Sequence, residues 1–256
     1  MPLLVEELFD YAAGNLNTLD GGTGWTGAWA TDASTTEQAR VVAGDLSYAG
    51  VSNGSETNTN KMLVNNEGSG TVNHYIQRDH NAIPNTVNGA VYWLAFTIAS
   101  NLAKGGSIFW LNKLTSDIAG NNPQTLLQWT SALADAKVQC GSLLYTGSAS
   151  YVSHVVVFKI TMSGAGATPV RVDVYCDVDM TTDPAGWTPK VTSTSWYVPA
   201  SITQVNWDSE TNASSSADDK LYMDNLRWAT TSYEAGGNAV PSNVKNSAFL
   251  QFFRQF

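Results

Sequence analysis

The sequence is poor in the residues that build most metal and acid–base centres. It has three histidines and two cysteines among 256 residues, and charged residues make up only 14%. Two cysteines do not make a disulfide framework in so long a chain, so we expect Cys140 and Cys176 to be unbridged thiols. No zinc-ligand spacing, glycine-rich phosphate loop or redox cysteine pair occurs. These absences lead us to expect that the protein is not an enzyme.

Basic residues are also scarce. Lysine and arginine number 13 against 22 acidic residues, which gives a net charge of −9 and a pI of about 4.6. Such a charge repels phosphate backbones and anionic lipid, so we expect neither nucleic acid nor membrane as a partner. No apolar run approaches the roughly 20 residues that span a bilayer. The start at Met1 lacks the basic and apolar regions of a secretion signal, which favours a virion or an extracellular particle surface.

Aromatic and β-branched residues are plentiful instead, with nine Trp and ten Tyr in the chain. Valine and cysteine alternate with polar residues from Val170 to Val178, which predicts a half-buried strand. Residues 151–162 are too β-branched for a helix and predict a central strand packed on both sides. Further strands are predicted at 71–78, 89–99, 106–111, 124–129, 137–145 and 220–229. The pattern is typical of an all-β sandwich.

The C-terminal residues differ from the rest. We predict one domain over residues 1–236 and a linker with a docking tail over 237–256. The tail places Phe249, Phe252, Phe253 and Phe256 at helical spacing, although an extended strand also fits. So many apolar rings must be covered, either by the tail's own domain or by a neighbouring subunit. We expect a homo-oligomer or a larger protein assembly held through this tail.

Several segments, taken in order, resemble a known group of domains. They are Leu8-Phe9-Asp10-Tyr11, Gly21-Gly22-Thr23-Gly24-Trp25-Thr26-Gly27-Ala28-Trp29, Leu46-Ser47-Tyr48-Ala49-Gly50, residues 91–100, and Leu221-Tyr222-Met223-Asp224-Asn225-Leu226-Arg227-Trp228. Together they resemble the concanavalin A-like lectin/glucanase (laminin G-like) domains of bacteria and phages, over roughly residues 6–236. The resemblance implies an antiparallel two-sheet jelly-roll sandwich. It leaves the function open, because this superfamily contains lectins, hydrolases, adhesion modules and structural domains.

The glycines of residues 21–27 allow tight turns, so Trp25 and Trp29 are predicted to fold back as lids over one end of the sandwich.

The glucanases of this group carry a Glu-x-Asp-x-x-Glu motif, and this sequence lacks it. The nearest substitutes are Asp173 and Asp177, which share one strand face. We expect this face to be solvated and polar rather than catalytic. We expect His74 and His154, on apolar strands, to be packed histidines rather than bases.

A carbohydrate site is predicted in residues 184–212, a region that we expect to be rich in loops. Sugar rings stack on aromatic side chains, while Asp and Asn bind hydroxyl groups. The candidate ligand-binding residues are Trp187, Trp196, Tyr197, Trp207, Asp208 and Asn212. The same tryptophans could also be core or lid residues, and the sequence leaves both readings open.

Calcium is the one cofactor that the sequence suggests. The acidic run from Asp177 fails as an EF-hand, because Thr182 and Thr188 stand where that loop needs Gly and Glu. A looser site, of the kind that laminin G-like domains have, would involve Asp218, Asp219 or Asp224. In regular alternation Asp224 and Arg227 lie on opposite faces of the last strand, so we expect no pairing between them.

The sequence therefore predicts a non-enzymatic structural or assembly module with a lectin-like fold, such as a capsid decoration or fibre-type protein. A carbohydrate-binding lectin is the alternative, and a glycoside hydrolase is a further one.

Overall fold

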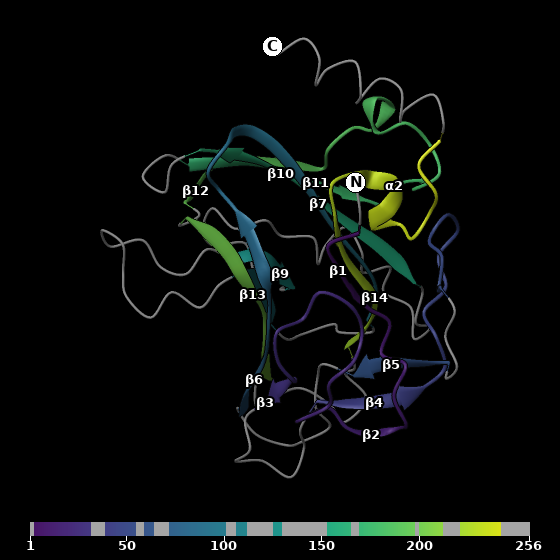
Figure 1. Ribbon diagram of the computed structural model, residues 1–256. Coiled ribbons are helices and arrows are strands. Elements are labelled where there is room, and N and C mark those ends of the chain that lie inside the picture. The colour runs from purple at the N-terminus through teal and green to yellow at the C-terminus, as the bar shows by residue number, and fades with distance from the viewer. Residues whose placement is uncertain are drawn as a thin grey trace.

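Strands make up most of the described chain, and they lie in two layers (Figure 1). The computed structural model describes residues 3–31, 39–54, 59–63, 72–100, 106–111, 125–129, 153–164, 169–197, 200–211 and 221–241. Every pairing between these strands is antiparallel.

The larger sheet has nine described strands and the smaller sheet has five. In spatial order the larger sheet runs β12 (Val191–Tyr197), β11 (Pro169–Cys176), β10 (His154–Ser163), β7 (Asn88–Ser100), β14 (Leu221–Ala229), β5 (Asn60–Leu63), β4 (Arg40–Ala43) and β2 (Gly14–Asn15), and β1 (Val5–Glu7) also pairs with β14. The smaller sheet runs β3 (Ala30–Thr31), β6 (Val72–Pro84), β13 (Ser201–Thr211), β8 (Gly106–Leu111) and β9 (Thr125–Trp129). This arrangement confirms the predicted jelly-roll sandwich.

The core between the sheets is built from alternate residues of the strands, because successive side chains of a strand point to opposite faces. From the larger sheet, Leu94, Phe96 and Phe158 enter it fully buried. From the smaller sheet, Ile76 and Val205 meet them. Trp25 and Trp29 pack against the same core, and Trp29 is buried in it. That they cover one end of the sandwich stays a prediction.

The larger sheet has a second apolar layer on its outer face, which we define as the face turned away from the smaller sheet. Trp93, Val155, Val157 and Tyr175 are buried there. Residues from three separate segments cover them, among them Tyr48, Val51, Met180, Trp187 and Ala235 of helix α2 (Ser232–Ala235). Strand β10 is therefore packed on both faces, as its β-branched sequence predicts.

The region 184–212 is not rich in loops, contrary to our expectation. It contains β12 and β13, which pair with β11 and β6. The Thr, Val, Trp and Tyr residues of β12 favour extended backbone. Strand β12 forms one edge of the larger sheet, whereas β13 lies between β6 and β8 in the smaller sheet. Before β12 the chain forms a short 3-10 helix, η1 (Pro184–Gly186), which is capped by the Asp183 side chain.

Strand β14 also departs from the sequence prediction. Asn225 has a φ of 55°, and the register with β7 shifts between Asp224 and Arg227. This bulge reverses the alternation, so Leu226 and Trp228 enter the core between the sheets. Asp224 and Arg227 therefore both meet residues 46–52 on the outer face: Leu46 N donates to Asp224 Oδ2 (3.1 Å), and Arg227 Nη2 donates to the Ser52 carbonyl (2.7 Å). The prediction that they lie on opposite faces was wrong.

Several predictions fall outside the described residues. These are Cys140, the strand at 137–145, and the tail with its four phenylalanines, so the domain boundary after residue 236 stays a prediction. Cys176 is buried in the core between the sheets. Within the described ranges, no helix has the length and apolar character needed to cross a membrane.

Candidate functional site

The residues predicted to bind carbohydrate are distributed over both sheets. Residues 196–197 end β12 of the larger sheet, and residues 207–208 lie in β13 of the smaller sheet. Asn212 lies outside the described residues. Trp187 follows η1 and packs on the outer face of the larger sheet. Trp187 is the member around which other described side chains converge.

Three aromatic rings meet on this outer face, and we call them the aromatic cluster: Trp93 of β7, Tyr175 of β11 and Trp187. The ring centroids are 5.9 Å apart for Trp93 and Trp187, 5.6 Å for Tyr175 and Trp187, and 6.2 Å for Trp93 and Tyr175. These separations and tilts are those at which aromatic pairs attract. Trp93 and Tyr175 are each 5% exposed, whereas Trp187 is partly open to solvent.

A polar row crosses four strands beside the aromatic cluster. Trp93, Lys159, Asp173 and Thr192 are direct cross-strand neighbours on β7, β10, β11 and β12. The ammonium of Lys159 lies 5.5 Å from the Trp93 ring centroid. Thr192 Oγ1 donates to Asp173 Oδ1 at 2.6 Å. The row therefore places a cation, a carboxylate and a hydroxyl group beside the rings.

Arg171 holds the carboxylate of this row from two residues earlier on the same face of β11. Its Nε lies 3.1 and 3.0 Å from the two Asp173 oxygens, and its Nη2 lies 2.9 Å from Oδ1. Burial raises the pKa of Asp173, but hydrogen bonds from Arg171 and Thr192 outweigh it and leave that pKa below its ordinary value. The Asp173 side chain is only 5% exposed, so the expectation of a solvated face was wrong for this residue.

The loop that carries Trp187 is held by its own hydrogen bonds. Asp179 Oδ1 accepts from the Thr181 amide (2.9 Å) and hydroxyl (2.6 Å), and Asp183 Oδ1 accepts from Ala185 N (2.9 Å). Trp187 Nε1 donates to Thr182 Oγ1 at 3.0 Å. The indole is therefore fixed in position rather than loosely attached.

Asp177 does not pair with Asp173. It follows the last residue of β11 with a φ of 55°. His154 Nδ1 lies 2.9 Å from its Oδ2, and Val155 N donates to its Oδ1 at 3.3 Å. Each carboxylate thus has separate hydrogen-bond partners. His154 is 9% exposed at the end of β10, as expected of a packed histidine, whereas the side chain of His74 is not among those described.

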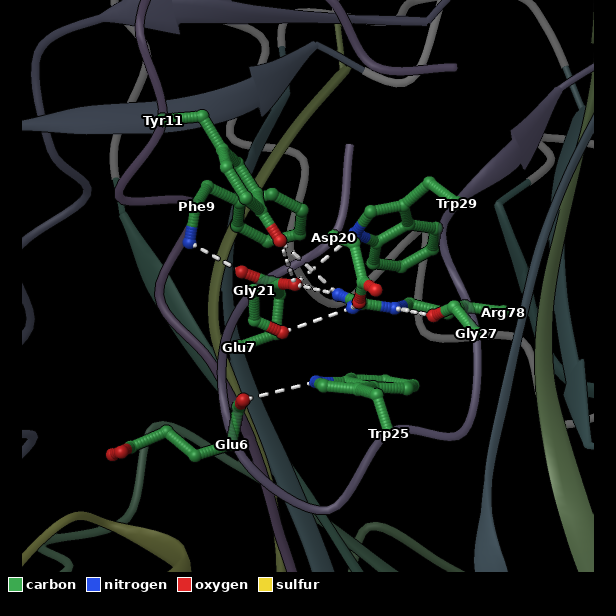
Figure 2. A network of polar contacts seen from close by, with 10 residues as sticks. All are labelled: Glu6, Glu7, Phe9, Tyr11, Asp20, Gly21, Trp25, Gly27, Trp29 and Arg78. Carbon is green, nitrogen blue, oxygen red and sulfur yellow. Dashed lines mark hydrogen bonds and ion pairs between the residues drawn. The ribbon is translucent and has the colours of Figure 1, made fainter. Parts of the chain in front are cut away.

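A second polar network lies between the sheets (Figure 2). Arg78 of β6 and Glu7 of β1 form an ion pair there, and each residue is 1% exposed. Trp25 lies below the guanidinium with its ring centroid 4.5 Å away, and Trp29 is on the other side at 5.5 Å. Arg78 also donates to acceptors on Tyr11, Asp20, Gly21 and Gly27, at distances between 2.7 and 3.1 Å.

This network is closed to ligands. The Arg78 bonds use all five N–H donors of a guanidinium group. Glu7 in turn accepts from Phe9 N (2.9 Å), the Tyr11 hydroxyl (2.9 Å) and Trp29 Nε1 (3.1 Å). Burial raises the pKa of Glu7, against the opposing charge of Arg78. With no donor left over and almost no exposure, the pair fixes the N-terminal segment rather than a substrate.

The calcium prediction concerns three aspartates, of which Asp218 and Asp219 lie outside the described residues. Asp224 is fully buried, and its carboxylate accepts from the amides of Leu46 (3.1 Å) and Asn225 (2.8 Å). Two oxygens near it, Asp45 Oδ1 and Asn225 Oδ1, are buried without a hydrogen-bond donor in the described part of the chain. Oxygen ligands suit calcium. No group of three or more His, Cys, Asp or Glu among the described residues could hold a metal ion.

The sequence analysis missed Trp93 and Lys159 as site residues. In β7 both faces are apolar, because Trp93 and Ala95 alternate with Leu94 and Phe96, so alternation alone could not assign a face. Lys159 offered a signal that we did not use. It is the one charged residue in the apolar run of β10, which marks the outer face of that strand.

No protein-family model matches this sequence, and neither does any curated protein. Solved structures of similar fold include an endo-β-1,4-glucuronan lyase from the fungus Trichoderma reesei, with 12% identity over 89% of this chain and 98% of that chain, at a TM-score of 0.46. A carbohydrate esterase from bacteriophage phi24B has 13% identity over 88% and 97% of the two chains, at 0.48. Lectin II from Ulex europaeus has 12% identity over 74% and 92%, at 0.36. At such identities the likeness concerns the fold.

These comparisons correct one expectation. We expected a protein that is not an enzyme, but the similar structures include a lyase and an esterase beside lectins. The exclusion was wrong, because it took the scarcity of histidine, cysteine and charged residues, and the absence of a few known motifs, as evidence against every reaction. The fold itself is lectin-like.

Proposed function

We propose that this protein binds carbohydrate on the outer face of its larger sheet, at the aromatic cluster of Trp93, Tyr175 and Trp187. The main observation behind this proposal is that three aromatic rings meet on the outer face of the larger sheet, away from the central core, and that Trp187 is partly open to solvent. The apolar face of a sugar ring packs on such a surface. In the adjoining row, Lys159 supplies hydrogen-bond donors for hydroxyl groups, and Thr192 Oγ1, which donates its own proton to Asp173, can accept one.

The fixed position of Trp187 supports this proposal. A ring that is already held by Thr182 and by two aromatic neighbours loses little conformational freedom when a ligand stacks on it. Arg171 and Asp173 likewise hold each other beside the rings without a ligand.

The test is binding to a panel of oligosaccharides, followed by calorimetry on the strongest ligand. We expect Trp187→Ala to weaken binding by about tenfold or more, since stacking on one aromatic ring contributes on the order of 1 kcal/mol or more. Val87→Ala is the control, because Val87 is an exposed apolar residue between β6 and β7. Unchanged affinity in a folded Trp187→Ala protein would refute the proposal, as would the absence of binding across the panel.

Two further roles stay predictions, because their residues lie outside the described ranges. One is assembly into an oligomer or a virion through the tail with Phe249, Phe252, Phe253 and Phe256. The other is calcium binding with Asp218 or Asp219.

A further inference from the structure

The polar row beside the aromatic cluster holds two cations and one carboxylate. Asp173 has cations on two sides, Arg171 along its own strand and Lys159 as its cross-strand neighbour, and both lower its pKa. One carboxylate therefore faces two cations, in a chain whose net charge is −9.

The two cations are not equivalent. Arg171 is bound to both Asp173 oxygens, and Thr192 donates to the same carboxylate. The Asp173 carboxylate thus already accepts hydrogen bonds from Arg171 and Thr192, without any from Lys159. Lys159 is only partly exposed, and its ammonium lies over the Trp93 ring, on the side of the cluster. The ammonium of Lys159 is therefore the positive charge of this row that can contact a ligand.

We propose that the sugar recognised at the aromatic cluster bears an anionic group, carboxylate or sulfate, which pairs with Lys159. This inference rests on the proposed carbohydrate-binding function and names its ligand class. A partly desolvated ammonium forms stronger hydrogen bonds to an anion than to a hydroxyl group. Neutral sugars still stack on Trp187, but without this ion pair.

The net charge of the chain does not prevent such binding. At physiological ionic strength, exposed charges more than about 8 Å apart are largely screened. Lys159 would act at contact distance, where screening is weakest. Selectivity for an anionic sugar is therefore decided within the row, and the acidic residues outside it, Asp179 and Asp183 of the Trp187 loop among them, mainly slow the approach of the ligand.

The experiment compares two oligosaccharides of equal length and linkage, one neutral and one with each C6 hydroxymethyl group oxidised to carboxylate. A sulfated oligosaccharide of the same backbone forms the third arm and distinguishes the two anionic groups. We expect an anionic ligand to bind about tenfold more tightly than the neutral one, as expected for one partly desolvated ion pair. Lys159→Gln should remove this preference, because the Gln amide can still donate a hydrogen bond to a hydroxyl group but carries no charge, so the anionic ligand should lose more affinity than the neutral one.

Two variants serve as controls. Lys159→Arg keeps the charge and should keep most of the preference. Arg40→Gln removes a cation from β4, remote from β10 in the strand order of the same sheet, and should change nothing. If the neutral and anionic sugars bind equally and Lys159→Gln has no effect, this inference fails while the proposed function stands. If no sugar of any kind binds, both fail.

Discussion

Two buried arginines hold the first strand in the sandwich. Glu6 and Glu7 are successive residues of β1, so their side chains point to opposite faces. Glu7 meets Arg78 between the sheets, and Glu6 Oε1 accepts from Arg227 Nε at 2.8 Å on the outer side. Each arginine side chain is 0% exposed. A buried charge that loses its partner is costly, so these pairs make β1 indispensable to the fold.

Replacing Arg78 should therefore be strongly destabilising. We expect Arg78→Met to lower the free energy of unfolding by about 3–5 kcal/mol, because Glu7 would remain buried without its counter-charge. Urea denaturation measures this loss. The double variant Glu7→Gln, Arg78→Met should be less destabilised than Arg78→Met alone, since it removes the unpaired charge. A loss below about 1 kcal/mol for the single variant would contradict this account of the pair.

His80 should make stability depend on pH. Burial lowers the pKa of His80 below its ordinary value of 6.5. Its Nδ1 lies 2.8 Å from the Asn81 carbonyl, and its Nε2 is buried without a partner in the described part of the chain. As the pH falls through 6.5 the unfolded chain takes up a proton that the folded protein resists, so the stability that is present above pH 6.5 is lost below it.

We expect this loss to approach about 1.4 kcal/mol per pH unit at its steepest, measured by urea unfolding between pH 7.5 and pH 5. His80→Gln should flatten that part of the profile. An identical pH profile in the variant would show that other groups are responsible.

At the level of elements, the segment of residues 21–27 depends on glycine at particular positions. Gly24 has a φ of 81°, and a Cβ there would lie 2.0 Å from the Leu4 carbonyl oxygen. We expect Gly24→Ala to cost about 3 kcal/mol or more, because both the backbone conformation and the contact oppose a side chain. Thermal unfolding with Gly27→Ala as the matched control tests this, since nothing lies within 4 Å of a Cβ at Gly27. Equal melting temperatures for the two variants would contradict it.

The elements that the sequence predicted well are those with one strong local pattern. Strand β10 contains a β-branched run, and β11 shows strict alternation of apolar and polar residues. Both patterns are typical of strands and not of helices. Strand β12 was missed because serine and threonine dominate it and suggest a loop, although pairing with β11 makes it a strand. The bulge at Asn225 has no signal in alternation, because the shift of one residue is set by contacts of β14 with β7 and residues 46–52.

The candidate site was only partly predictable for a related reason. Trp187 was predicted as one of several aromatic residues that gather in the stretch 184–212. Its partners come from β7, β10 and β11, which lie far apart along the chain and become neighbours only through the strand order. Sequence proximity instead favoured residues 196–212, of which the structure places 196–197 on another strand of the same sheet and 207–208 on the smaller sheet.

For the whole molecule, the two-layer architecture leaves two outward faces on which a polysaccharide could lie. The outer face of the larger sheet carries the aromatic cluster and the row with Lys159, whereas the outward face of the smaller sheet belongs to β6, β13 and β8 (Figure 1). Our account assigns ligand binding to the larger sheet. The buried Arg78 network lies between the layers and has a structural role.

A crystal structure of the protein with a bound anionic oligosaccharide tests this assignment most directly. We expect one sugar ring to stack on the exposed side of Trp187, with its anionic group within hydrogen-bond distance of Lys159 Nζ. A sugar bound instead across β6 and β13 of the smaller sheet, with Trp187 and Lys159 untouched, would contradict the account.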